Sequence, residues 1–257
     1  MSGPSLAELR ATGQPPEVIE RLNDEHWAGR LYLRRVSPRA TWVFARLGWS
    51  PNAVTVGFIV CGVAAGVVVA LGGLWSAIAA AILIQAYLLL DCSDGELARW
   101  SGRFSATGIY LDRVGHYLGE AALLTGLGFR AQGHLTVSGP YVTAGLAAAL
   151  LAMIVKAETD NVIVARSESG LPESPTDAAL APRGSGLALA RRLAASLKVH
   201  RIIQAVELSL LILVAAIIDA FAGNLTATRV LLIACLVIAG LMVIAHLLAI
   251  VASRRLR

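Results

Sequence analysis

Long apolar stretches follow one another along the chain after residue 50. Each can supply most of the roughly 20 helical residues that cross about 30 Å of hydrocarbon. None shows the alternation of apolar and polar residues that is typical of a strand, and lipid does not accept unpaired backbone groups. The pattern therefore predicts an all-α integral membrane bundle of six transmembrane helices. The expected spans are residues 52–71, 74–90 with an extension to 99, 106–129, 141–156, 200–221 and 229–252.

Residues 1–50 are more polar than the rest of the chain. The segment "PPEVIERLNDEHWAGRLYLRRVSPRATWVFARLGWSPN" interleaves apolar and aromatic residues with arginine. This mixture is typical of an amphipathic helix that lies in the membrane interface. A soluble cap that packs on the membrane helices is the alternative. We expect a cytoplasmic or interfacial N-terminal segment over residues 1–50 and a membrane domain over residues 51–257.

Composition and charge agree with a membrane protein. Hydrophobic residues make up 56% of the chain and charged residues only 15%, whereas soluble domains average about 25% charged. The net charge is +5, and the arginines gather before the first span, after the second, before the fifth and at the C-terminus. The positive-inside rule then places both termini in the cytoplasm. In such a protein the basic excess indicates topology and contact with anionic lipid, and no nucleic-acid partner is expected.

Acidic residues gather where the second and third spans meet. Asp91 and Asp94 are three residues apart, and Asp112 and His116 are four apart, so each pair shares one helix face. The short turn over residues 100–105 makes the two helices antiparallel neighbours, and we expect both faces to converge. Carboxylates in one partly dry site repel each other unless a cation neutralises them. Their oxygens suit Mg²⁺ or Mn²⁺, usually in company with phosphate.

Other residues of the second span fit an anionic ligand. Gly95 and Ala98 leave space for a flat group to approach the helix, and Arg99 offers a planar fork to a phosphate. Two alternatives remain open. The acids can pair with nearby arginines at the membrane interface, or they can form the ion site of a transporter. The acids lie at one membrane face only, which favours an enzyme over a transporter.

These residues resemble the signature of the CDP-alcohol phosphotransferases, also called CDP-alcohol phosphatidyltransferases. That signature is Asp-x-x-Asp-Gly-x-x-Ala-Arg, eight residues, Gly, three residues, Asp, three residues, Asp. His116 stands at its last position in place of aspartate, and "SPNAVT", with Asn52 and Thr55, resembles a second recurring feature of the family. The matching positions are Asp91, Asp94, Gly95, Ala98, Arg99, Gly108 and Asp112.

The resemblance implies transfer of a phosphate-linked group from a CDP-alcohol to an acceptor alcohol, with release of CMP, in phospholipid or related phosphodiester synthesis. It implies that Asp91, Asp94 and Asp112 hold a divalent metal against the diphosphate. Gly95, Ala98 and Gly108 then make room for the cytidine, and Arg99 binds phosphate or positions an aspartate. The implied partners are the CDP-alcohol donor, an acceptor that can itself be phosphorylated, and membrane lipid. Neither alcohol is identified.

His116 occupies the place of the family's proposed catalytic base. Its reference pKa of about 6.5 is nearer neutrality than the roughly 3.9 of aspartate, so a neutral imidazole can accept the proton of the attacking hydroxyl. We expect this role, with Glu120 orienting the ring. His116 as a metal ligand, which favours a softer ion than Mg²⁺, is one alternative. A catalytically silent protein that still binds CDP-alcohol is another.

Two further features are expected near the site. Lys156 and Arg201 border the fourth and fifth spans on the same side of the membrane and can present positive charge to the acceptor. Snorkelling to the interface is their alternative role. The Gly-x-x-x-Gly pairs Gly62/Gly66 and Gly115/Gly119 predict close helix packing. These pairs alone do not establish a homodimer, which stays open.

Overall fold

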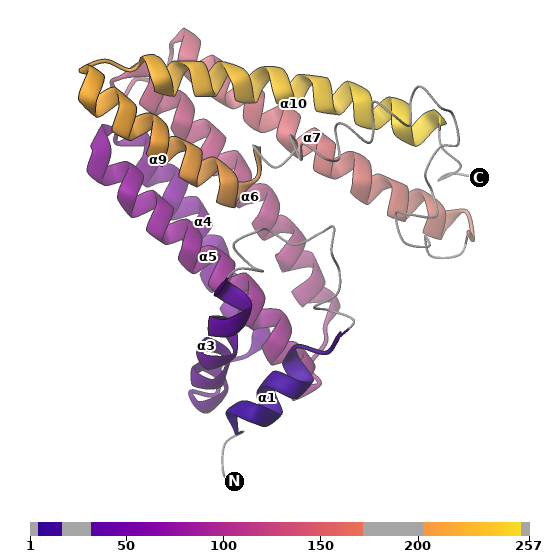
Figure 1. Ribbon diagram of the computed structural model, residues 1–257. Helices are drawn as coiled ribbons and strands as arrows, with labels where there is room; N and C mark the ends of the chain where they lie inside the picture. The colour runs from indigo at the N-terminus through magenta and orange to yellow at the C-terminus, as the bar shows by residue number, and fades with distance from the viewer. Residues whose placement is uncertain (1–4, 17–31, 172–202, 253–257) are drawn as a thin grey trace.

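The computed structural model describes residues 5–16, 32–171 and 203–252, and within these ranges the chain forms helices joined by turns, with no strand. The all-α prediction is confirmed for this part of the chain. Helices are labelled as in Figure 1. They are α1 (Leu6–Gly13), α3 (Arg34–Arg46), α4 (Pro51–Ala70), α5 (Gly73–Ser101), α6 (Ala106–Gln132), α7 (Pro140–Glu168), α9 (Ala205–Ala222) and α10 (Thr226–Ala252).

Five of these helices, α4, α5, α7, α9 and α10, are long and apolar enough to cross a membrane. They correspond to five of the predicted spans, and the protein is an integral membrane protein. The remaining predicted span coincides with α6, which has 27 residues but carries Asp112, Arg113 and His116 among its apolar positions. The length of α6 suits a membrane span, but its hydropathy is lower than that of the five other helices. The sixth span therefore stays a prediction.

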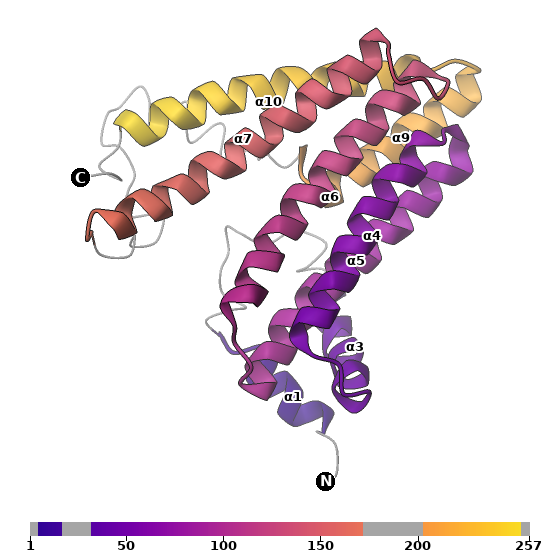
Figure 2. The ribbon, with the colours of Figure 1, turned by 180° about the vertical axis from the view of Figure 1, so that it is seen from behind.

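The helices form a bundle from which one pair departs at an angle. α4 packs between α5 and α6, α9 packs on α5, and α7 packs on α6. α10 runs beside α7, and these two leave the α4–α6 group together (Figures 1 and 2). The buried apolar cluster extends through all six long helices and includes Phe58, Leu123, Ala148, Leu208 and Leu232.

Glycines let α4 and α6 approach closely. A Cβ on Gly66 would lie 2.4 Å from the backbone of Ala122, and a Cβ on Gly126 would lie 2.1 Å from the carbonyl oxygen of Gly66. A Cβ on Gly115 would lie 2.2 Å from the Phe58 ring. Real Cβ atoms do not come this near, so these positions accept only glycine without a shift of the helices. The predicted packing role of the glycine pairs is confirmed.

The turn between α5 and α6 brings the motif residues together. α5 ends at Ser101, and the next residue, Gly102, has a φ of 65° in the left-handed region that favours glycine. α6 then begins after Ser105, whose hydroxyl accepts a hydrogen bond from the Gly108 N–H at 3.0 Å. These two caps reverse the chain within a few residues, as the sequence predicts, so the C-terminal end of α5 faces the N-terminal end of α6.

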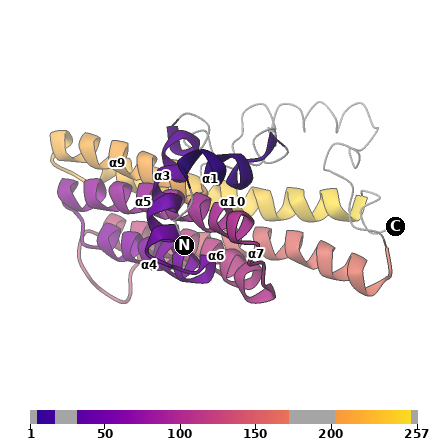
Figure 3. The ribbon, with the colours of Figure 1, turned by 90° about the horizontal axis from the view of Figure 1, so that it is seen from below.

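The N-terminal helices cover the end of α5. α1 and α3 contact each other and α5, and Figure 3 shows both beside that end. α3 buries Ser37, Pro38 and Thr41. This packing fits the alternative of a cap that packs on the membrane helices, for the part of the segment that the structure describes. The interfacial helix stays a prediction, and its residues 17–31 lie outside the described ranges.

Candidate active site

Two acids and a histidine meet between α5 and α6. His116 Nε2 lies 3.3 Å from Asp91 Oδ1 and 3.7 Å from Asp112 Oδ1. One ligand atom from each of the three residues lies within 4.8 Å of the other two. The convergence expected from helix periodicity is therefore present, with His116 inside the group. The distances suit one shared cation.

Asp94 is held differently from the other two aspartates. Its side chain is buried, with 8% of the residue exposed, and the Thr55 hydroxyl donates to Asp94 Oδ2 at 2.7 Å. Asp94 is not among the three residues whose ligand atoms cluster, although it lines the same cavity. Thr55 was expected at the donor site through the "SPNAVT" resemblance. The structure gives it a specific contact, which orients Asp94 from α4.

Tyr87 is a residue of the site that sequence patterns do not reveal. Its hydroxyl lies 2.7 Å from His116 Nδ1. The ring is 1% exposed and fills the space beside two glycines, where a Cβ on Gly62 or Gly119 would come within 2.9 or 3.1 Å of it. Within an apolar span Tyr87 looks like a packing residue. The sequence feature that could have indicated a site role is its spacing: Tyr87 lies four residues before Asp91 and therefore on the same helix face.

Glu120, which was expected to orient the His116 ring, has Lys156 beside it. The Lys156 ammonium lies 3.1 Å from Glu120 Oε1. The observed contact on His116 Nδ1 is the Tyr87 hydroxyl, which takes the place predicted for Glu120. Lys156 is thus part of an ion pair between α6 and α7. Its role toward the acceptor stays a prediction, in which a charged ligand takes the place of Glu120.

A second group of charges joins the same two helices. Arg113 pairs with Asp160, and the Tyr117 hydroxyl donates to Asp160 Oδ2 at 3.0 Å. On the far side of α7, His246 Nδ1 lies 3.1 Å from Glu158 Oε2. The α6–α7–α10 side of the acid group is therefore polar and internally paired. Arg201, the other predicted acceptor residue, lies outside the described residues.

A cavity of about 480 Å³ opens between α4, α5, α6 and the N-terminal end of α3. This volume is within the range of small-molecule sites. Acids and arginines both line it, which suits a ligand of negative groups bridged to the protein by a cation. Every expected donor-site residue lines it: Asn52, Thr55, Asp91, Asp94, Gly95, Ala98, Arg99, Gly108, Asp112 and His116.

The small residues of the motif leave space that protein side chains partly use. A Cβ on Gly108 would lie 2.9 Å from Asn52 Oδ1 and 3.2 Å from Ser105 Oγ. A Cβ on Gly95 would lie 3.2 Å from the Arg99 guanidinium. The glycines thus keep Asn52 and Arg99 in place at the cavity wall. Their expected role in admitting the cytidine stays a prediction.

Arginines of the cavity come from two distant parts of the chain. Arg99 follows the aspartates on α5, as expected, Arg103 lies in the turn after α5, and Arg34 joins them from α3. Arg99 Nε donates to the Gly13 carbonyl oxygen at 2.7 Å, so one edge of its guanidinium is fixed by the end of α1. Arg34 was not a predicted site residue, because no local pattern relates it to the motif.

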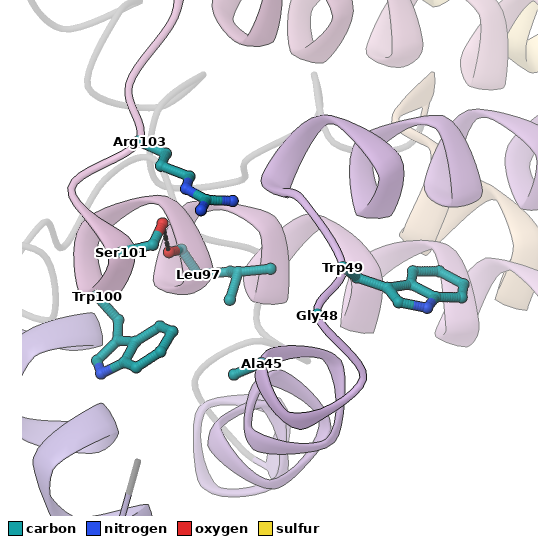
Figure 4. A pocket seen from close by; sticks show the side chains of 7 residues that line it. All are labelled: Ala45, Gly48, Trp49, Leu97, Trp100, Ser101 and Arg103. Atoms are coloured by element: carbon teal, nitrogen blue, oxygen red, sulfur yellow. Dashed lines mark hydrogen bonds between the residues drawn. The ribbon is translucent and has the colours of Figure 1, made fainter. Parts of the chain in front are cut away.

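A second cavity of about 440 Å³ lies beside the first, between the end of α3 and the end of α5 (Figure 4). Trp49 and Trp100 lie on two sides of it, and Arg103 lines both cavities. Its lining contains no carboxylate. It therefore offers no carboxylate ligand for a hard cation, and the candidate chemistry belongs to the first cavity.

The family model for CDP-alcohol phosphatidyltransferase matches residues 49–255, which include the acid group and all the donor-site residues above. The chain belongs to the CDP-alcohol phosphatidyltransferase family. The suspected resemblance is confirmed. A comparison with curated proteins finds no match. The family consists of transferases that use a CDP-alcohol donor and an alcohol acceptor, generally with a divalent metal, and Asp91, Asp112 and His116 are a group that fits such an ion.

Proposed function

We propose that this CDP-alcohol phosphatidyltransferase family member is an active membrane enzyme. It transfers a substituted phosphate group from a CDP-alcohol to an acceptor alcohol and releases CMP, in the synthesis of a phospholipid or a related phosphodiester. The observation that carries the proposal is the meeting of Asp91, Asp112 and His116 at one cavity that arginines also line. Membership in the family supplies the reaction class.

Divalent metal fits the donor set of this cavity. Asp91, Asp94 and Asp112 would supply carboxylate oxygens, and His116 would supply a ring nitrogen or stay just outside the ligand shell. Mg²⁺ prefers oxygen ligands and phosphate, whereas Mn²⁺ accepts an imidazole more readily. A bound ion would neutralise the donor diphosphate and make CMP a better leaving group. Thr55 holds Asp94 in one orientation for that purpose.

His116 is placed to handle the acceptor proton. If the Nδ1–H donates to the Tyr87 oxygen, the Nε2 lone pair faces Asp91 and Asp112. That tautomer can accept a proton from the attacking hydroxyl, and it is also the one a metal ligand requires. The contact with Tyr87 supports both roles, and the histidine substitution does not by itself remove the base.

The acceptor is expected to approach from the side of α7. Lys156 and Arg201 would offer positive charge to a phosphorylated acceptor. For this, Lys156 would leave its ion pair with Glu120 and bind the acceptor phosphate. Lys156 pairs with Glu120, which lies one turn after His116 on α6, and the Arg113–Asp160 pair joins the same two helices. This placement supports entry between α6 and α7, close to the atom that takes the proton.

We also propose the orientation of the enzyme. The bundle would cross the membrane six times, with α6 as the sixth span, because its 27 residues are long enough when Asp112 and His116 face the cavity. Both termini and the cavity would face the cytoplasm, because arginines concentrate at that end of the bundle. The polar end of α6 would lie near the interface, where its charges remain hydrated.

The test is a screen of CDP-linked donors against alcohol acceptors with the purified protein, with CMP release as the readout. We expect release with Mg²⁺ or Mn²⁺, and its loss on chelation. Asp91→Asn should lower the rate about 100-fold or more, because it removes a charged ligand from the acid group. Asp219→Asn is the matched control, since Asp219 is a buried acid that binds the backbone N–H of Ala227 and Thr228 at the start of α10.

Two results would change the proposal. If a CDP-alcohol binds but no combination of donor, acceptor and metal releases CMP, the protein is a silent binding member of the family. If metal is carried across a membrane without CMP formation, the acid group belongs to a transporter. Equal rates for Asp91→Asn and Asp219→Asn would show that the site is wrongly assigned.

A further inference from the structure

Glu96 is a buried acid within the motif segment that does not line the donor cavity. It lies on α5 two residues after Asp94 and is fully buried, with 0% of the residue exposed. A buried carboxylate is costly unless hydrogen bonds compensate it. Its position in the signature is one of the unspecified ones, so the motif does not explain why an acid stands here.

The compensation comes from the N-terminal helices. Gln14 Nε2, at the end of α1, donates to Glu96 Oε1 at 2.8 Å, and Thr41 Oγ1, on α3, donates to Glu96 Oε2 at 2.7 Å. The Ser37 hydroxyl, also on α3, donates to Glu96 Oε1. Ser37 and Thr41 are themselves 0% exposed. One carboxylate on α5 therefore binds donors from two helices that precede it by more than fifty residues in the chain.

The same network reaches the arginines of the donor cavity. Gln14 Nε2 also donates to the Arg34 carbonyl oxygen at 2.8 Å, which fixes the backbone that carries the Arg34 side chain. One turn after Glu96, Arg99 Nε donates to the Gly13 carbonyl oxygen at 2.7 Å. Both side chains line the cavity that contains the acid group. The docking of α1 and α3 on α5 thus decides where two of the cavity's guanidinium groups lie.

Close packing at this junction leaves little freedom for another arrangement. A Cβ on Gly13 would lie 3.2 Å from the Glu96 Cβ, so the end of α1 rests directly on this side chain. Polar bonds fix the register of the contact more strictly than apolar packing alone, because each donor must meet its own oxygen. A shift of α1 or α3 along α5 would break several of them together.

We propose that α1 and α3 form a wall of the CDP-alcohol site, with Glu96 as the positioning residue that docks them and with Arg34 and Arg99 as the groups that bind the donor diphosphate. This inference rests on the proposed function and extends it to the N-terminal segment. Guanidinium groups bind phosphate oxygens through two parallel hydrogen bonds, and this geometry is lost when the group is displaced by about an ångström. The N-terminal segment is then part of the substrate site as well as a cap.

The test compares buried hydroxyls inside and outside the network. Ser37→Ala and Thr41→Ala each remove one donor to Glu96, and Ser209→Ala is the matched control. Ser209 is 1% exposed on α9, and its hydroxyl donates only to the Val206 carbonyl among the contacts described. We expect the KM for the CDP-alcohol to rise about tenfold in Ser37→Ala and Thr41→Ala, with kcat and the acceptor KM within about twofold. Ser209→Ala should leave all three values unchanged.

Arg34 variants test the wall itself. The Arg34 side chain is half-buried, and its backbone carbonyl keeps the bond from Gln14 in any variant, so Arg34→Ala is expected to fold even where the buried hydroxyl variants do not. We expect about a tenfold higher donor KM in Arg34→Ala and partial recovery in Arg34→Lys, since lysine restores the charge without the fork. Melting temperatures measured for each variant separate a binding effect from a loss of fold.

The outcomes separate this inference from the proposed function. A wild-type protein that releases no CMP from any donor overturns both. A wild-type protein that turns over, with donor KM unchanged in Arg34→Ala and in the hydroxyl variants, overturns the inference alone. Lower melting temperatures and lower kcat with an unchanged donor KM would assign Glu96 to stability only, and would also overturn it.

Discussion

At the scale of single residues, His116 is where this site departs from the family's motif. Family members with an aspartate there have a fourth carboxylate, whereas this protein has an imidazole with two acids on one nitrogen and Tyr87 on the other. A carboxylate would add negative charge to Asp91 and Asp112, while a neutral imidazole does not. Fewer negative charges then have to be neutralised before the donor binds. Histidine in place of aspartate at position 116 therefore also lowers the positive charge that bound metal must supply.

The corresponding prediction separates the base from the ligand. If His116 is the base, His116→Ala should lower kcat by about 100-fold or more at saturating Mg²⁺, with little change in the donor KM. His116→Asp should keep much of the activity, because it restores the residue that the family pattern has there. The measurement is CMP release over a range of Mg²⁺ and Mn²⁺ concentrations.

Each other outcome of that experiment has a definite meaning. Recovery of His116→Ala by a higher concentration or a different choice of metal would identify His116 as a ligand. An unchanged kcat in His116→Ala would contradict the base role. Tyr110→Phe is the control for a mild change on α6, since Tyr110 is 65% exposed and does not line the cavity.

Sequence patterns could predict the site residues that meet through helix spacing, and could not predict those that meet through packing between helices. Asp91, Asp112 and His116 were predictable, because helix periodicity and a short turn bring them together. The contact of Thr55 with Asp94 and that of Tyr87 with His116 depend on how α4, α5 and α6 pack. Glu96 was unpredictable for the same reason, since its donors lie on α1 and α3. Spacing predicts which residues share a face, and only packing decides what that face meets.

At the scale of helices, the apolar pattern predicts centres better than ends. The fourth predicted span stopped at residue 156, whereas α7 continues to Glu168. The added turns carry Glu158 and Asp160, which pair with His246 and Arg113. Because both acids have partners, the helix can continue through them. Charged residues that find partners on neighbouring helices do not end a helix, and the apolar pattern alone cannot show those partners.

Helix packing around Gly66 yields a stability prediction. Gly66→Ala should destabilise the fold by about 1–3 kcal/mol or more, because the new methyl would lie 2.4 Å from the Ala122 backbone and force α4 away from α6. Gly57→Ala is the matched control on the same helix. Its methyl would meet only Leu90 Cδ1 at 3.5 Å, so it should be neutral or stabilising by up to about 1 kcal/mol. Thermal unfolding in detergent measures both, and equal melting temperatures would contradict the close approach.

At the scale of the whole molecule, basic side chains distinguish the two ends of the bundle. The opposite end also contains arginines, but they are used for packing. Arg130 is 3% exposed and donates to the Gly73 carbonyl oxygen at 2.9 Å, and Arg229 donates to that of Ala131 at 3.1 Å. The described arginines at the cavity end include Arg10, Arg34, Arg35, Arg39, Arg46, Arg99, Arg103 and Arg113. Only the cavity end therefore resembles a cytoplasmic face.

The prediction from this asymmetry is that the turn after α5 lies in the cytoplasm and the loop after α6 lies outside it. Phe104 and Val137 are 72% and 92% exposed in these two connections, so Phe104→Cys and Val137→Cys are a matched pair. The free cysteines Cys61, Cys92 and Cys235 lie within helices and are replaced first to remove background. A membrane-impermeant maleimide should label Val137→Cys in intact cells and Phe104→Cys only after permeabilisation. Labelling of Phe104→Cys from outside would reverse the orientation and place the donor cavity on the other side of the membrane.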